Sequence, residues 1–170
     1  MKKTLIIALG CIAVMFASCK KPVEPTPEPV DYSVNYLGNY LGSFTFTLTS
    51  MNNEPQTGLS FPIDSIRMDI TKGEGSNVVV TTVTVDNESH QTTGIATAEN
   101  VDFESVHLNI DKADQHYTFE LDLKMEGAPI QNDTLGITGS FGGKGTFEFA
   151  GQVTVLNEVS GTLVGNLKKQ

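Results

Sequence analysis

Apolar and polar side chains alternate along most of this chain, and a period of two is the pattern of β-strands. The clearest run spans residues 116–126, where every second position from Tyr117 to Met125 is apolar and the positions between are polar or charged. No stretch of ten residues carries the apolar stripe of an amphipathic helix. A sheet with one buried and one solvated face produces this alternation, so the chain is expected to be all-β and antiparallel.

Eight or nine strands are expected, separated by residues typical of turns. The expected strand ranges are 39–50, 62–72, 77–86, 92–98, 105–112, 116–126, 133–140, 144–156 and 158–168. The expected turns include Lys72–Ser76, Asp86–His90, Asp111–Gln115, Phe141–Thr146 and Asn157–Glu158. Because the connections are short, successive strands are expected to be neighbours in a meander.

A meander of this length leaves two sheet edges, and closure into a barrel removes both of them. Glycine within a strand marks a bend or a close approach of backbones, by which a sheet curls. Glycines are frequent late in the chain, at Gly136, Gly139, Gly142, Gly143, Gly145, Gly151, Gly161 and Gly165. We therefore expect a closed or nearly closed β-barrel, with a two-layer β-sandwich as the alternative.

The apolar positions of the alternating runs define an expected inward face. Its members are Phe44, Phe46, Leu48, Ile66, Met68, Ile70, Val83, Val85, Ile95, Leu108, Ile110, Phe119, Leu121, Leu123, Leu135, Ile137, Phe147 and Phe149. A small eight-stranded barrel is either filled by its own side chains or holds one small ligand. An apolar pocket and an ordinary packed core are therefore the two interpretations of this face.

The expected ligand contacts, if there is a pocket, are the large side chains of this face and tyrosines at its ends. They are Tyr36, Tyr40, Phe44, Phe46, Met68, Tyr117, Phe119 and Phe147. A tyrosine suits the end of such a pocket because its phenol combines apolar area with a hydrogen-bonding group.

The first nineteen residues have the layout of a bacterial secretion signal. Met1–Lys3 is cationic, Thr4–Phe16 is an apolar stretch, and small residues lead to Cys19. This ending resembles the lipobox of bacterial lipoproteins, which implies that residues 1–18 are a signal peptide and that Cys19 carries acyl chains as the first mature residue. The resemblance implies a lipid-anchored protein of the cell envelope, in the outer membrane. The alternative is ordinary cleavage near Ala17, which releases a free secreted protein.

Residues 19–34 are expected to be a linker between this anchor and a domain at 35–170. Prolines at positions 22, 25, 27 and 29 fix the backbone and favour an extended polyproline II spacer. At about 3.1 Å per residue, a dozen such residues span about 35–40 Å.

The mature chain is acidic and lacks a free cysteine. Without residues 1–19, nine basic side chains remain against twenty acidic ones, a net charge near −11. Such a surface repels nucleic acid and anionic headgroups, so nucleic acid is not an expected partner. Cys11 lies in the signal and Cys19 is consumed by the anchor, which leaves no thiol for a disulfide or a metal.

Groups for catalysis or metal binding are scarce. His107, Asp111, Asp114 and His116 flank one turn, but we expect them to be solvated rather than to bind zinc. The glycine-rich segment Phe141–Thr146 lacks the strand–loop–helix context of a phosphate-binding loop. The sequence therefore predicts no enzyme activity, no metal and no cofactor.

The segment Gly38–Gly42 resembles the opening motif of the calycins, the superfamily of lipocalins, fatty-acid-binding proteins and avidins, with Tyr40 at the position of their tryptophan. The anchored, strand-rich body also resembles the calycin-like lipoproteins of bacteria with two membranes. The resemblance implies a barrel and identifies no ligand. The expected function is to bind a small apolar or amphipathic ligand within the barrel. The alternative is a structural or interaction lipoprotein with a solid core, whose outer face contacts an envelope protein or a glycan.

Overall fold

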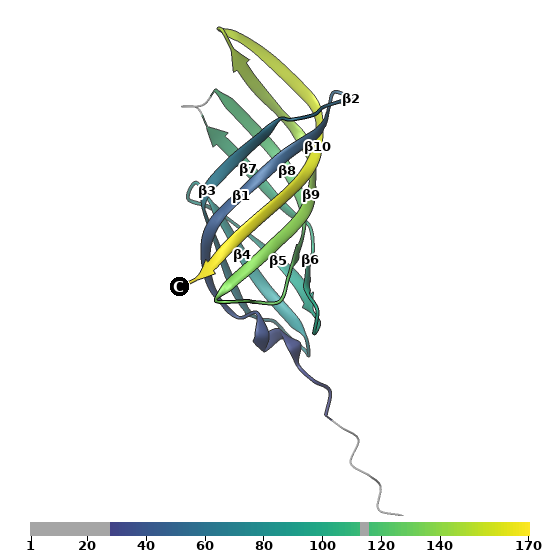
Figure 1. Ribbon diagram of the computed structural model, residues 1–170, viewed down its shortest axis with the longest axis vertical. Coiled ribbons are helices and arrows are strands. Elements are labelled where there is room, and N and C mark those ends of the chain that lie inside the picture. The colour runs from purple at the N-terminus through teal and green to yellow at the C-terminus, as the bar shows by residue number, and fades with distance from the viewer. Residues whose placement is uncertain (1–27, 113–115) are drawn as a thin grey trace, which may run out of the picture.

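The computed structural model describes residues 28–112 and 116–170, which form one short 3-10 helix and ten β-strands (Figure 1). The helix η1 is Tyr32–Asn35. The strands are β1 (Gly38–Met51), β2 (Glu54–Pro55), β3 (Ser60–Lys72), β4 (Val78–Val85), β5 (Glu88–Ala96), β6 (Val101–Phe103), β7 (Val106–Lys112), β8 (Tyr117–Gly127), β9 (Thr134–Phe149) and β10 (Gln152–Lys169). Residues 1–27, with the expected signal peptide and Cys19, lie outside the described residues.

The strands close into an antiparallel barrel of eight positions. Each main strand pairs with the next along the chain, and β1 closes the ring by pairing with both β3 and β10. Strands β6 and β7 follow one another along β8 and share one position in the wall, while the short β2 pairs only with the end of β1. The expected all-β barrel is confirmed, and the two-layer sandwich is wrong because β1 and β10 leave no open edge between them.

Two expected turns proved to be parts of long strands. Phe141–Thr146 lies inside β9, where Lys144 pairs with Glu120 of β8. A side chain on Gly143 would overlap the carbonyl oxygen of Glu120, so glycine here permits close strand packing rather than a reversal. Asn157–Glu158 is a bulge within β10, marked by a register shift between Leu156 and Val159.

The chain reverses direction at other residues. The β9–β10 hairpin turns at Ala150 and Gly151, whose φ angles are 51° and 76°. The β4–β5 hairpin turns at Asp86 and Asn87, with φ angles of 49° and 70°, so β5 starts at Glu88 rather than at residue 92. Asn, Asp and Gly tolerate this left-handed backbone, which is why such residues mark the turns.

Most side chains of the expected inward face form the core, which fills the barrel from the end near η1 to its middle. Fifteen of the eighteen predicted residues are buried: Phe44, Phe46, Leu48, Ile66, Met68, Ile70, Val83, Val85, Leu108, Ile110, Phe119, Leu121, Leu123, Leu135 and Ile137. Ile95 is wrong, since its side chain is 54% exposed and the inward positions of β5 belong to Thr92, Gly94 and Ala96. Phe147 is 42% exposed at the open end, and the side chain of Phe149 lies outside the description.

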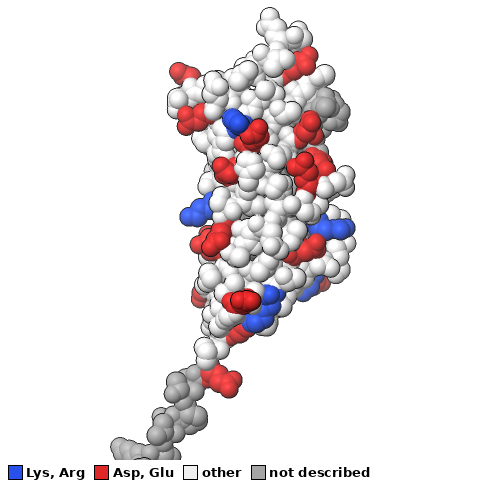
Figure 2. Space-filling view, turned by 180° about the vertical axis from the view of Figure 1, so that it is seen from behind, with Lys and Arg blue, Asp and Glu red and all other residues white. Residues whose placement is uncertain are grey.

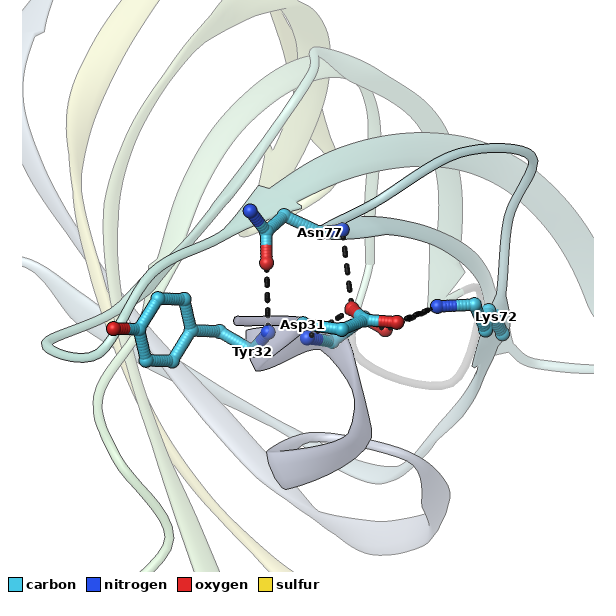
Figure 3. A network of polar contacts seen from close by, with 5 residues as sticks. Asp31, Tyr32, Lys72 and Asn77 are labelled. Atoms are coloured by element: carbon cyan, nitrogen blue, oxygen red, sulfur yellow. Dashed lines mark hydrogen bonds and ion pairs between the residues drawn. The ribbon is translucent and has the colours of Figure 1, made fainter. Parts of the chain in front are cut away.

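One end of the barrel is closed by η1 and the residues before it (Figure 3). Asp31 accepts hydrogen bonds from the backbone of Ser33 and Asn77, both at 3.1 Å, and forms an ion pair with Lys72. The side-chain oxygen of Asn77 in turn accepts the backbone N–H of Tyr32 at 2.7 Å. These contacts fix η1 on the turn between β3 and β4.

Two tyrosines complete this closed end. The Tyr40 hydroxyl donates to the carbonyl oxygen of Tyr36 at 2.8 Å, and the Tyr36 hydroxyl donates to that of Thr97 at 3.3 Å. Both side chains are fully buried. Burial raises the pKa of Tyr40 to about 12.

Candidate functional site

An apolar pocket of about 520 Å³ lies at the opposite end of the barrel, where the β9–β10 hairpin rises above the other strands (Figure 1). Its lining is Leu48, Met51, Leu59, Ser60, Phe61, Tyr117, Phe119, Phe147, Thr154 and Leu156. These residues come from the end of β1, the segment that starts β3, the start of β8, and the β9–β10 hairpin. The pocket therefore needs strands from both halves of the chain.

Aromatic rings separate this pocket from the core. The ring of Phe61 stacks with that of Phe46, 5.3 Å between centroids and 7° from parallel, and with that of Phe119, at 5.2 Å and 10°. Tyr117 packs against Phe61 and Phe119 at tilted angles, with centroids 5.6 Å and 5.5 Å away. Phe61 and Phe119 line the pocket whereas Phe46 is fully buried below them, so the stack forms the pocket floor.

The rim keeps large apolar side chains in contact with solvent. Leu59 and Phe147 are 43% and 42% exposed. On β10 the bulge at Asn157–Glu158 shifts the alternation by one residue. Before the bulge the even-numbered residues Thr154 and Leu156 line the pocket, and after it the odd-numbered residues face the interior. The same shift turns Val153 and Val155 to the outer face of the hairpin, where both are exposed.

Asn52 holds the bulge in place. Its side-chain oxygen accepts the backbone N–H of Asn157 at 2.8 Å, and its amide donates to the carbonyl oxygen of Val155 at 3.4 Å. The Asn52 amide thus replaces the strand neighbour that β10 lacks beyond the end of β1. This contact positions the hairpin that carries one wall of the pocket.

The predicted ligand contacts are divided between pocket, floor and core. Tyr117, Phe119 and Phe147 line the pocket, and Phe46 supports its floor. The other four lie away from it: Phe44 and Met68 are fully buried in the core, and Tyr36 and Tyr40 belong to the closed end.

Seven pocket residues were not among the predicted ligand contacts: Leu48, Met51, Leu59, Ser60, Phe61, Thr154 and Leu156. Phe61 was missed because the period of two breaks in β3: Phe61 and Ile63 point inward, and then Ile66 does. Ser65, with a φ of 60°, takes up the extra residue opposite a register shift between Gly42 and Phe44. The apolar alternation of Phe61 and Ile63 across Pro62 was the available signal.

Two polar atoms lie buried in the barrel wall without a hydrogen-bond partner among the described residues. They are Thr81 Oγ1 and His90 Nε2. Thr81 is fully buried on β4, opposite Thr92 of β5, and Thr92 differs because its hydroxyl donates to the carbonyl oxygen of Glu104 at 2.9 Å. His90 Nε2 is 3.7 Å from a carboxylate oxygen of Glu88, beyond hydrogen-bond range. An unpaired buried polar group destabilises a fold, so the Thr81 hydroxyl is expected to lower the unfolding free energy.

The histidines near the β7–β8 turn are not brought together. His107 Nδ1 is 2.9 Å from Asp122, and His116 Nδ1 is 3.5 Å from Glu148, so each faces its own carboxylate on a neighbouring strand. Asp114 lies outside the described residues. Within residues 28–112 and 116–170, no three His, Cys, Asp or Glu side chains assemble in a way that could hold a metal ion.

The outer face carries a hollow of about 580 Å³ lined by residues of β7, β8, β9 and β10 and by Glu88 of β5, and it shares Phe119 and Leu156 with the end pocket. Its walls include Asp111 and the ion pair between Lys144 and Glu120, whose N–O distance is 2.9 Å. Thr118 and Thr146 share a hydrogen bond of 2.7 Å within it. Figure 2 shows acidic side chains spread over one face of the molecule among uncharged ones, with fewer basic ones.

No protein-family model matches this chain. No curated protein matches it significantly. In the part of the chain that the structure describes, no helix has the length and apolar character that a membrane span requires.

Proposed function

We propose that this protein is a binding module whose end pocket holds a small apolar or amphipathic ligand. The observation that carries the proposal is the apolar pocket of about 520 Å³ with an aromatic floor and exposed Leu59 and Phe147 at its rim. Ligand pockets are typically about 300–1,000 Å³ and mostly apolar, with a few polar groups. A ligand that covers Leu59, Phe61 and Phe147 removes apolar surface from water at about 25 cal/mol per Å², which favours binding.

The barrel supports this proposal, and its packing leaves room for a ligand at one end. A closed eight-stranded antiparallel barrel is compatible with a calycin-like fold. Here the barrel is packed from the closed end up to the Phe46–Phe61–Phe119 stack, so a ligand would occupy the end of the barrel above that stack and not its axis.

The proposal includes the lipid anchor expected at Cys19 and a place in the outer membrane. The described chain enters the barrel at the closed end through Asp31 and η1 (Figure 1). A tether that leads to Cys19 would therefore hold the pocket mouth away from the lipid surface. Such a geometry suits a module that takes up its ligand from the aqueous side of the membrane.

We propose binding rather than catalysis. The polar residues of the pocket lining are Ser60, Tyr117 and Thr154, and the Ser60 hydroxyl is 2.9 Å from that of Thr47. Acid–base catalysis needs a group that transfers a proton near the working pH, and carboxylate and imidazole are the usual ones. Neither group lines the pocket among the described residues.

A second candidate function is contact with an envelope protein or a glycan through the outer face. The hollow across β7–β10 favours it, because Asn109, Asp111 and Lys144 present hydrogen-bonding groups around it. The two candidates predict different contact surfaces and are separable by mapping where a bound molecule lies.

The experiment that tests the leading proposal uses the uncharged fluorescent probe N-phenyl-1-naphthylamine. The protein is the full chain with Cys19→Ala, so that no acyl group competes for the pocket. We expect saturable fluorescence enhancement at a stoichiometry of one probe per chain. Substitution of Leu59 by Trp, which places a larger side chain at the rim, is expected to reduce probe affinity at least about fivefold. Val164→Trp, at an exposed position that is not part of the pocket lining, is the control. Absence of saturable binding, or equal affinity of both variants and the parent, would contradict the proposal.

A further inference from the structure

The pocket lining contains hydroxyl groups but no charged side chain among the residues that the structure describes. Thr154 is exposed at the rim, on the pocket side of β10. Tyr117 brings a phenol beside the aromatic floor. These groups donate and accept hydrogen bonds without carrying charge. A bound molecule can therefore pair an uncharged polar group with the Thr154 hydroxyl at the rim.

The basic side chains that the structure describes lie outside the pocket lining. Lys144 is on the outer face and is paired with Glu120 at 2.9 Å. Lys72 and Lys169 belong to the closed end, where Lys72 pairs with Asp31 and Lys169 donates to the carbonyl oxygen of Leu37 at 2.8 Å. Glu148, which follows Phe147 on β9, is not part of the pocket lining, and its carboxylate faces His116 at 3.5 Å. No described cation is placed to pair an anionic group in the pocket.

An acidic chain also disfavours an anion before it binds. The whole chain carries a formal net charge of −9, and excess negative charge lowers the local concentration of anions. A carboxylate moved from water into an apolar site without a cation or hydrogen-bond donors is strongly disfavoured, whereas a hydroxyl needs only one hydrogen bond to compensate for lost water.

We infer that the pocket selects uncharged amphiphiles, such as a fatty alcohol or a neutral ester, over the corresponding carboxylates. The apolar chain of such a ligand lies on Phe61 and Phe119, and its hydroxyl or carbonyl group stays at the rim beside Thr154. This inference rests on the proposed function, because it names the class of ligand for the same pocket.

The test is displacement of N-phenyl-1-naphthylamine by 1-octanol and by octanoate, two compounds of equal chain length, at pH 7. We expect 1-octanol to displace the probe at a concentration at least about tenfold lower than octanoate. Between pH 7 and pH 5 the apparent affinity for octanoate should rise more than about tenfold, because the neutral fraction of a carboxyl with a pKa of about 4.3 grows over this range. The affinity for 1-octanol should not change.

Variants locate the polar contact. Thr154→Val should weaken 1-octanol about threefold to fivefold more than it weakens the probe, because it removes the rim hydroxyl and keeps the shape. Lys112→Met tests whether a cation contributes to binding, because Lys112 is a basic residue whose backbone pairs with that of the pocket residue Tyr117 at the end of β7. We expect no change in the octanol-to-octanoate ratio.

The outcomes separate the two proposals. Octanoate that binds as tightly as 1-octanol at pH 7, or whose tight binding is lost in Lys112→Met, overturns the inference and leaves the proposed binding function standing. If neither compound displaces the probe and the probe itself does not bind, the proposed function is wrong and the inference falls with it.

Discussion

The ring of Phe61 stacks on the ring of Phe119, with centroids 5.2 Å apart and planes 10° from parallel. These residues belong to β3 and β8, which are not neighbours in the sheet, so the contact crosses the barrel. It divides the interior into a packed lower part and an upper pocket. The division explains how one small barrel has a solid core and still offers an apolar site.

Substitution of Phe61 by Ala should both destabilise the fold and enlarge the pocket. Removal of a large, mostly buried aromatic side chain typically costs about 3 kcal/mol of unfolding free energy, and the ring contacts with Phe46 and Phe119 are lost with it. Urea unfolding measures the loss. Phe61→Leu, which keeps most of the volume, should cost about half as much; equal losses for Ala and Leu would indicate that Phe61 does not act by filling space.

Phe147→Ala should weaken probe binding with little effect on stability, because this side chain is 42% exposed and lines the pocket. We expect about a fivefold to twentyfold loss of affinity for N-phenyl-1-naphthylamine, corresponding to about 1–2 kcal/mol of lost apolar contact. Val153→Ala is the matched control, since Val153 is exposed on the outer side of the same hairpin. A larger loss in the Val153 variant would place the binding surface outside the barrel.

Thr81→Val and Thr92→Val should have opposite outcomes although the two residues face each other on β4 and β5. Thr81 Oγ1 is buried without a partner, so its replacement by a methyl group should be neutral or stabilise by up to about 1 kcal/mol. Thr92 Oγ1 donates to the carbonyl oxygen of Glu104 at 2.9 Å, and its loss should cost about 1–2 kcal/mol. Chemical denaturation of both variants checks the difference, and equal destabilisation would mean that the Thr81 hydroxyl is satisfied.

Stability should fall as pH rises from about 10 to about 12. Burial raises the pKa of Tyr40 to about 12, above its ordinary value of 10.0. The folded state therefore keeps the proton over a range where the unfolded chain loses it, and deprotonation favours unfolding. The stabilisation is complete below pH 10 and is lost as pH approaches 12. Tyr40→Phe should flatten this part of the profile, as measured by the urea midpoint; an unchanged slope would assign the effect to other groups.

The fold was predictable because its signal is repetitive. From Tyr117 to Met125 each apolar residue faces the interior, and this pattern alone identifies a half-buried antiparallel strand. The alternation fails where a bulge adds a residue, as at Ser65 in β3 and at Asn157–Glu158 in β10. A bulge has no apolar signature of its own, so the expected register was lost at both places.

The pocket was less predictable for the same reason. Phe61 and Thr154 become pocket residues only because a bulge in their strand resets which positions face inward. In β9 the glycines Gly143 and Gly145 were interpreted as a turn, although they serve the close approach of β8. Tyr117 and Phe119 were found because no bulge interrupts β8.

The most direct measurement of the central claim is an NMR titration of the protein with N-phenyl-1-naphthylamine. The account predicts that the largest amide shifts fall on Leu48, Leu59, Phe61 and Thr154, around the pocket. It predicts unchanged signals for Asn109, Glu120 and Lys144, which line the outer hollow. Shifts concentrated on the outer hollow, or no saturable shifts at all, would contradict it.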